Sequence, residues 1–153
     1  MSSRDPERLG ELVLEAVRRA RVRAVLLSGW GGLAGRGDED IFVTDEVPHD
    51  WLYPKRPPSC TTGATLTAGV PAVVVPFVVH QAVWGSRVDV LGVGPTPIPR
   101  KRLTADALAG ALRGATTDSA MTRRAADLGA RIRAENGVAA AANHLDSFSL
   151  GQA

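Results

Sequence analysis

The sequence has few of the residues on which several classes of protein depend. Its single cysteine, Cys60, cannot form an internal disulfide or anchor a cysteine-rich zinc site. Aromatic residues make up only 5% of the 153 residues. The longest apolar run, 72–79, is interrupted by Pro76 and is far shorter than the roughly 20 residues that cross a bilayer as a helix. We therefore expect a cytoplasmic protein without stable membrane insertion.

The chain also lacks an excess of charge of one sign. Lysine and arginine number 18 and aspartate and glutamate 16, and the arginines are spread among acidic residues rather than gathered in a block. This distribution argues against a nucleic-acid partner. With 44% hydrophobic and 22% charged residues, no internal repeat and no long linker, residues 1–153 are expected to form a single domain.

Familiar catalytic and metal-binding motifs are missing as well. The sequence has no G-x-G-x-x-G, P-loop, G-x-S-x-G or H-E-x-x-H motif. His49 and His80 have no acidic residue at ligand spacing, and His144 falls on an alanine-rich helix where a surface role is expected. We therefore expect no metal and no cofactor.

Short apolar segments that favour strands alternate with segments of helical periodicity. Asp5 and Pro6 are typical of a helix start, and Pro54, Pro57 and Pro58 exclude regular structure from 51–60. The segment 70–77 is the clearest strand, because it is β-branched and apolar on both faces. We predict strands at 22–27, 40–44, 70–77 and 92–94, and helices beginning at Pro6, Thr61, Gln81, after the Thr104 cap, at Ser119 and at Val138. This alternation predicts an α/β domain with a parallel sheet.

In such sheets ligands bind beyond the carboxyl ends of the strands. Three loops qualify, and each contains a tryptophan: Trp30, Trp51 and Trp84. Either these rings stack on a ligand or they pack at the edge of the sheet, as tryptophans at strand ends more often do. From these residues alone, the chain is a nucleotide- or small-ligand-binding α/β domain.

A series of short motifs narrows this interpretation. They are Arg23-Ala-Val-Leu-Leu-Ser-Gly-Trp-Gly-Gly-Leu33, Val47-Pro-His-Asp-Trp-Leu-Tyr-Pro54, Thr61-Thr62, Ala68-Gly-Val-Pro71, Val74-Val-Pro-Phe77, Gln81, Trp84-Gly85 and Gly92-Val-Gly-Pro95. In order and spacing, from Arg4 to about Phe148, the chain resembles the C-terminal half of sterol-type UDP-glycosyltransferases. This inverting family of the GT-B fold, with two Rossmann-like domains, includes the glycopeptide and macrolide glycosyltransferases.

The resemblance implies a site for a nucleotide sugar, UDP-glucose or a relative of it. In the family, two loops surround the base and ribose, a helix N-terminus holds the diphosphate, and an acidic residue followed by glutamine binds the sugar hydroxyls. The matching donor-binding residues here are Ser28, Gly29 and Trp30 with Val47, Pro48 and His49 for the nucleoside, Thr61 and Thr62 for the diphosphate, and His80 and Gln81 for the sugar.

The chain departs from the family in three ways. Residues 55–60 replace a buried strand and the His-Gly-Gly-x-Gly part of the diphosphate loop. His80 replaces the acidic sugar ligand, and the N-terminal acceptor domain with its catalytic base has no counterpart. The sheet is therefore expected to be incomplete. Either the strand at 22–27 pairs directly with the one at 72–77, or the domain is open in the middle.

These departures predict a donor-binding domain that carries no catalytic residue and transfers no sugar by itself. Two alternatives remain open. The chain is either a non-catalytic binding or partner module, completed by a separate N-terminal half, or a decayed remnant of such an enzyme. Sterol-type acceptors would bring the intact enzyme to the membrane periphery.

Overall fold

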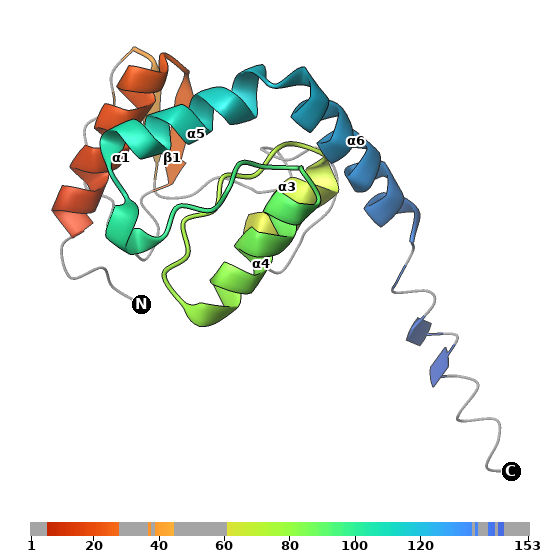
Figure 1. Ribbon diagram of the computed structural model, residues 1–153. Coiled ribbons are helices and arrows are strands. Elements are labelled where there is room, and N and C mark those ends of the chain that lie inside the picture. The colour runs from red at the N-terminus through yellow and green to blue at the C-terminus, as the bar shows by residue number, and fades with distance from the viewer. Residues whose placement is uncertain are drawn as a thin grey trace, which may run out of the picture.

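The computed structural model describes residues 6–27, 37, 39–44, 61–135, 137, 141–142 and 144–145. Figure 1 shows helix α1 beside helix α5, with strand β1 behind them and helices α3, α4 and α6 in the other part of the molecule. The elements are α1 (Pro6–Ala20), β1 (Ala24–Leu27), β2 (Ile41–Thr44), α3 (Thr61–Ala68), α4 (Val79–Val90), the 3-10 turn η2 (Arg100–Arg102), α5 (Ala105–Thr117) and α6 (Ser119–Ala134).

Helix α1 packs against two different partners. Leu14 and Val17 face the strands, where they bury Ile41. Ala16 and Ala20 are buried in the cluster that α1 forms with α5 and Ile98, and their small side chains let the two helices approach closely. The predicted amphipathic helix is confirmed, and it joins the sheet to α5.

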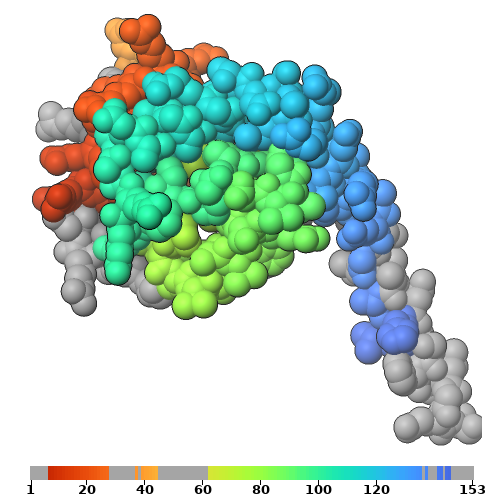
Figure 2. All heavy atoms as spheres, in the orientation of Figure 1, coloured from red at the N-terminus to blue at the C-terminus, as the bar shows by residue number. Residues whose placement is uncertain are grey.

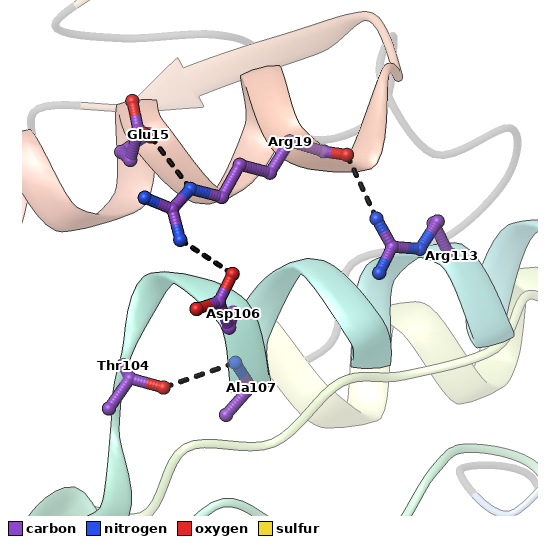
Figure 3. A network of polar contacts seen from close by, with 6 residues as sticks. All are labelled: Glu15, Arg19, Thr104, Asp106, Ala107 and Arg113. Carbon is purple, nitrogen blue, oxygen red and sulfur yellow. Dashed lines mark hydrogen bonds and ion pairs between the residues drawn. The ribbon is translucent and has the colours of Figure 1, made fainter.

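Polar contacts connect the exposed edges of α1 and α5 (Figure 3). The guanidinium of Arg19 binds the carboxylates of Asp106, at 2.5 Å, and Glu15, at 2.7 Å. The hydrogen bond that Arg19 donates to Asp106, and next the one that it donates to Glu15, raise the pKa of Arg19 above its ordinary value. Arg113 in turn donates to the carbonyl oxygen of Arg19 at 2.9 Å. Because these groups are exposed to water, they set the register of the two helices more than they stabilise the fold.

Strands β1 and β2 form a two-stranded parallel sheet. Ala24 pairs with Ile41 and Leu27 with Thr44, so the two carboxyl ends lie at the same edge. One face of the pair is covered by α1, whereas Val25 and Phe42 on the opposite face are exposed. Both strands lie within the predicted segments.

The prediction of a strand at 70–77 is wrong, because the segment is not part of a regular sheet. The expectation that its side chains are buried on both faces is confirmed. Ala72 and Val74 enter one apolar cluster and Val73 and Val75 enter another, so the side chains alternate as in a buried strand. Two hydrogen bonds join this extended segment to the following one: Ala72 N–H to the carbonyl of Val93 and Ile98 N–H to that of Val74, both 3.1 Å.

The neighbouring segment explains why no regular ladder forms. Pro95 and Pro97 fall where a parallel partner would donate, and they have no N–H. The predicted strand at 92–94 is wrong for the same reason. Gly94 nevertheless approaches the Ala72 carbonyl so closely that any Cβ would clash with it. The pair therefore keeps the direction and closeness of a parallel sheet without its ladder.

The domain is open beside this segment. Among the described residues, β1 forms its backbone pairs with β2 and has none with 72–75. A hollow of about 490 Å³ lies there, lined by α3, the extended segment and the second half of α5: Thr62, Thr65, Val70, Pro71, Ala72, Val73, Val74, Leu112, Ala115 and Thr116. Among the described residues the direct pairing of 22–27 with 72–77 is not formed, which agrees with the open arrangement.

The C-terminal helices are capped by side chains at their N-termini. The Thr104 hydroxyl accepts from Ala107 N–H at 3.1 Å, which confirms the predicted cap, and α5 ends at Thr117. Asp118 then caps α6, accepting from the N–H groups of Ala120 and Met121. The C-terminal end of α6 projects from the body in Figure 2. Of the helix predicted from Val138, the described residues 141–142 and 144–145 are helical.

Candidate functional site

The six residues predicted to surround the nucleoside lie outside the described residues. Ser28, Gly29 and Trp30 follow the last residue of β1 directly, and Val47, Pro48 and His49 begin three positions after β2 ends. The structure therefore places the strand ends from which both groups start, but not the residues themselves. Their assignment to the nucleoside remains a prediction.

The predicted diphosphate residues stand at the start of α3. Thr61 and Thr62 are its first two residues, the position at which backbone N–H groups and the positive end of a helix favour an anion. Thr62 is half-buried and lines the hollow beside the extended segment. The helix is held from behind by α6, where Arg133 donates to the carbonyl oxygen of Thr67.

Gln81 has a structural task that sequence reasoning missed. Its side-chain Oε1 accepts from the N–H groups of Phe77, at 2.7 Å, and Val78, at 3.3 Å, just ahead of α4. Val78 is the N-cap residue and has no polar side chain, so Gln81 satisfies donors that would otherwise lack a partner. The carbonyl half of the amide is thus engaged, and the NH₂ half is the part suited to a ligand oxygen.

His80 is exposed on the first turn of α4, one residue before Gln81. Its imidazole offers at most one acceptor nitrogen, whereas a carboxylate could accept hydrogen bonds from two sugar hydroxyls. Trp84 is also exposed on α4, away from the buried Gly85 and Val88. Neither interpretation of this tryptophan is decided by its position.

The predicted donor residues that the structure describes lie on helices that share one apolar cluster. Leu66 of α3 and Val88 of α4 belong to one apolar cluster, which also includes Ala72 and Val74. The diphosphate pair therefore opens one helix of this packed unit and the sugar pair opens the other. The positions predicted for an anion and for sugar hydroxyls thus share one packed support.

A contact before α4 was not anticipated from the sequence. The guanidinium of Arg100 lies over the Phe77 ring, 5.3 Å from its centre, and fixes η2 beside the start of α4. The hint in the sequence was the run Arg100-Lys101-Arg102, the most concentrated positive charge in this region. Cation–aromatic contacts of this kind join segments far apart in sequence, so spacing alone cannot reveal them.

Within the described part of the chain, no three histidine, cysteine or acidic side chains are grouped so that they could hold a metal ion. Nor does that part contain a helix with the length and apolar character needed to cross a membrane.

Comparison with curated proteins yields several close matches. The chain is 37% identical over 150 residues to a sterol 3-beta-glucosyltransferase of Komagataella phaffii, 39% over 155 residues to one of Cryptococcus neoformans, and 35% over 145 residues to one of Arabidopsis thaliana. These alignments take in 90%, 88% and 90% of the chain. The chain is homologous to sterol 3-beta-glucosyltransferases. No protein-family model matches it.

The homology to sterol 3-beta-glucosyltransferases confirms the resemblance found in the sequence. The chain spans only 12%, 10% and 23% of these three relatives, so it corresponds to a small part of each. The Cryptococcus alignment covers 155 positions, more than the 153 residues of the chain, although 88% of the chain takes part. Within the matched range the relative thus has positions that this chain lacks, as an internal deletion requires.

Proposed function

We propose that the chain is the donor-binding part of a glucosyltransferase, that it binds UDP-glucose or a closely related nucleotide sugar, and that it transfers no sugar by itself. The observation that carries the proposal is the 35–39% identity to sterol 3-beta-glucosyltransferases over about nine tenths of the chain. In the complete enzyme the acceptor would be a sterol or another lipophilic alcohol. Transfer would need an acceptor-binding half in addition to residues 1–153.

The geometry of α3 and α4 supports donor binding. The start of α3, at Thr61 and Thr62, offers a positive helix end to a diphosphate. The start of α4 presents His80 and the amide NH₂ of Gln81, whose orientation is set by its two backbone hydrogen bonds. An amide held in this way pays less entropy on binding a sugar hydroxyl than a free side chain would.

The chemistry explains why binding without transfer is expected. In an inverting transfer a base removes the acceptor proton, the acceptor oxygen bonds to the anomeric carbon, and the bond from that carbon to the diphosphate oxygen breaks. Residues of this chain would stabilise the negative charge on the departing UDP. The resemblance assigns the base to the N-terminal, acceptor-binding half of the family, so residues 1–153 are expected to bind the donor without transferring sugar.

Calorimetric titration of the purified chain with UDP tests donor binding. We expect saturable binding that is weakened about ten-fold or more in Thr61→Ala, because alanine lacks the hydroxyl that would donate a hydrogen bond to the diphosphate. Thr67→Ala, in the last turn of the same helix, is the matched control and should bind normally. A folded chain that binds neither UDP nor UDP-glucose would overturn the proposal.

Turnover of radiolabelled UDP-glucose in the presence of a sterol tests the proposal that the chain transfers no sugar by itself. The expected result is no product above the buffer control. Product formed by the chain alone would contradict the assignment of the base to a separate half, while leaving donor binding intact.

A further inference from the structure

The extended segment and the segment beside it bring two groups of residues to one edge of the domain. The hydrogen bonds from Ala72 to Val93 and from Ile98 to Val74 show that the two segments run in the same direction. Figure 1 shows them side by side, ending on the same side of the molecule. The first segment leads to the start of α4 and the second leads to η2. Helix α4 and η2 therefore begin at the kind of edge where α/β domains bind ligands.

The contact between Arg100 and Phe77 joins these two ends. The guanidinium lies 5.3 Å from the centre of the Phe77 ring, and the N–H of Phe77 donates to the side-chain oxygen of Gln81. A single residue thus contacts both the cation and the glutamine that is predicted to bind the sugar. Arg100 is therefore held beside the predicted sugar position.

The predicted diphosphate position lies on the other side of the extended segment. Thr62 lines the hollow there, and no described residue of 93–98 takes part in that lining. The order along the edge is therefore the diphosphate residues of α3, the sugar residues of α4 and the cations of η2. A donor that follows this order, with its sugar at Gln81, would turn the far end of the sugar toward Arg100.

The described groups around this end of the sugar position donate hydrogen bonds or carry positive charge. Arg100, Lys101 and Arg102 are consecutive and exposed, and none of them forms an ion pair with a carboxylate of the described residues. The ring of His80 supplies at least one N–H donor, and the amide NH₂ of Gln81 donates as well. Hydrogen bonds from charged donors are strongest to an anionic oxygen. This position therefore suits a carboxylate better than a hydroxyl.

Two negative charges lie near this position in the chain. Asp89 is the only acidic residue of 61–105, and it stands eight residues beyond Gln81, about 12 Å away along the axis of α4. Asp106, the second residue of α5, is bound by Arg19 of α1. Together these carboxylates balance at most two of the three adjacent cations of η2. The surplus charge beside Phe77 is therefore positive.

We propose that the sugar of the donor carries a carboxylate, as a hexuronic acid does, and that Arg100 binds it. This proposal rests on the proposed function, because it takes the sugar to lie at His80 and Gln81. A guanidinium can pair with a carboxylate through two parallel N–H···O bonds, which a single hydroxyl cannot accept. Histidine in place of the family's acidic residue fits the same ligand, because a carboxylate at position 80 would repel an acidic sugar.

Calorimetric titration of the purified chain with three ligands tests the proposal. The ligands are UDP, UDP-glucose and UDP-glucuronate, which differ in the sugar and in its carboxylate. We expect all three to bind, and UDP-glucuronate to bind at least about ten-fold more tightly than UDP-glucose.

Substitutions at the contact assign the preference to Arg100. Arg100→Gln should weaken binding of UDP-glucuronate about ten-fold and leave the affinities for UDP and UDP-glucose within about two-fold. Phe77→Leu keeps the N–H that Gln81 accepts but removes the ring, so it should lower the preference several-fold by releasing the guanidinium. Arg131→Gln on α6 removes one exposed positive charge elsewhere and should keep the preference. Circular dichroism verifies that each variant is folded.

Three outcomes would overturn the proposal. They are equal affinity for the two nucleotide sugars, a preference that survives Arg100→Gln, and an equal loss in Arg131→Gln, which would reduce the effect to net charge. If UDP still bound in these cases, donor binding would stand and only the acidic sugar would fall. If none of the three ligands bound to the folded chain, the proposed function would fall as well.

Discussion

Gln81 illustrates, for a single residue, how a fold and a ligand can share one side chain. Its carbonyl oxygen caps α4 by accepting from Phe77 and Val78, so the glutamine would be required even without a ligand. The sequence resemblance identified the residue but could not reveal the cap, because Val78 has no polar side chain that would signal a capping box.

His80 provides the clearest test of the sugar position. His80→Asp introduces a carboxylate that can accept hydrogen bonds from two hydroxyls, at a helix start where negative charge is favoured. We expect affinity for UDP-glucose to rise about ten-fold while affinity for UDP changes little. Calorimetric titration with both ligands measures the difference. An equal change for the two would show that position 80 does not contact the sugar.

Asp118 has an effect on stability that depends on pH. Hydrogen bonds from Met121 and Ala120 lower the pKa of its carboxyl group, and Arg124 and Arg123 act in the same direction. A lowered folded-state pKa means that the cap stabilises the fold fully above the ordinary carboxylate pKa and is lost as the pH falls through the folded value.

We therefore expect Asp118→Asn to reduce this acid-side dependence, because asparagine can cap but does not titrate there. Asp118→Ala should lower the Tm by roughly 2–4 °C near neutral pH, through loss of the cap. Thermal unfolding followed by circular dichroism across the acidic range measures both. If Asp118→Asn lost stability with falling pH as steeply as the unmodified chain, the loss would have to be assigned to other carboxylates.

Among the elements, the packing of α6 against α3 depends on glycine. A Cβ at Gly129 would lie 2.6 Å from the Gly69 Cα and 2.9 Å from the Leu66 carbonyl, and both neighbours are backbone atoms that cannot rotate aside. Gly110 in α5, by contrast, has open space around it. The two helical glycines therefore make a matched pair.

Gly129→Ala is expected to destabilise the protein by about 1–3 kcal/mol, because the helices must separate. Gly110→Ala should stabilise it by about 0.5–1 kcal/mol through helix propensity. Urea unfolding of the two variants measures the difference in the free energy of unfolding. If both alanines stabilised the chain, the close approach of α6 to the Gly69 turn would be wrong.

The elements also show what sequence patterns can and cannot predict. Helical periodicity located α1, and Thr104 marked the start of α5, because both signals are local. Residues 70–77 were predicted as a strand from valines that are indeed buried on both sides. Whether such a segment joins a ladder depends on its neighbour, and the prolines at 95 and 97 decided the outcome.

In the whole molecule, the extended segment connects clusters that would otherwise be separate. Val74 belongs to the cluster of α3, α4 and α6, and Val73 to the cluster of α1 and α5. We therefore expect the described elements to unfold as one cooperative unit. A substitution that destabilises one cluster should therefore lower the stability of the other by the same amount.

Leu108→Ala tests this cooperativity. Leu108 is buried between α1 and α5, so its truncation should cost about 2–4 kcal/mol of unfolding free energy. Native-state hydrogen exchange should show an equal loss of protection for the most protected amides of α6. Protection that falls in α1 and α5 but persists in α6 would indicate two independently unfolding parts.

For the whole molecule, the sequence predicted the candidate site only in part. Motif order identified the family, because short motifs retain their order when the segments between them change. Four of the ten predicted donor residues fall at helix starts in the structure: Thr61, Thr62, His80 and Gln81. Their role in binding a ligand stays a prediction. The hollow beside α5 and the contact of Arg100 with Phe77 join segments that are distant in sequence, which no local pattern encodes.

The alternate prolines at 95, 97 and 99 have one more consequence, for solubility. An open domain with a β-branched segment such as 72–75 is at risk of adding strands from other molecules and growing into aggregates. The segment that runs beside it covers this edge, and prolines in an edge segment are one of the devices that make such an edge a poor template for further strands. The prolines that prevent a regular ladder within the molecule thus also discourage one between molecules.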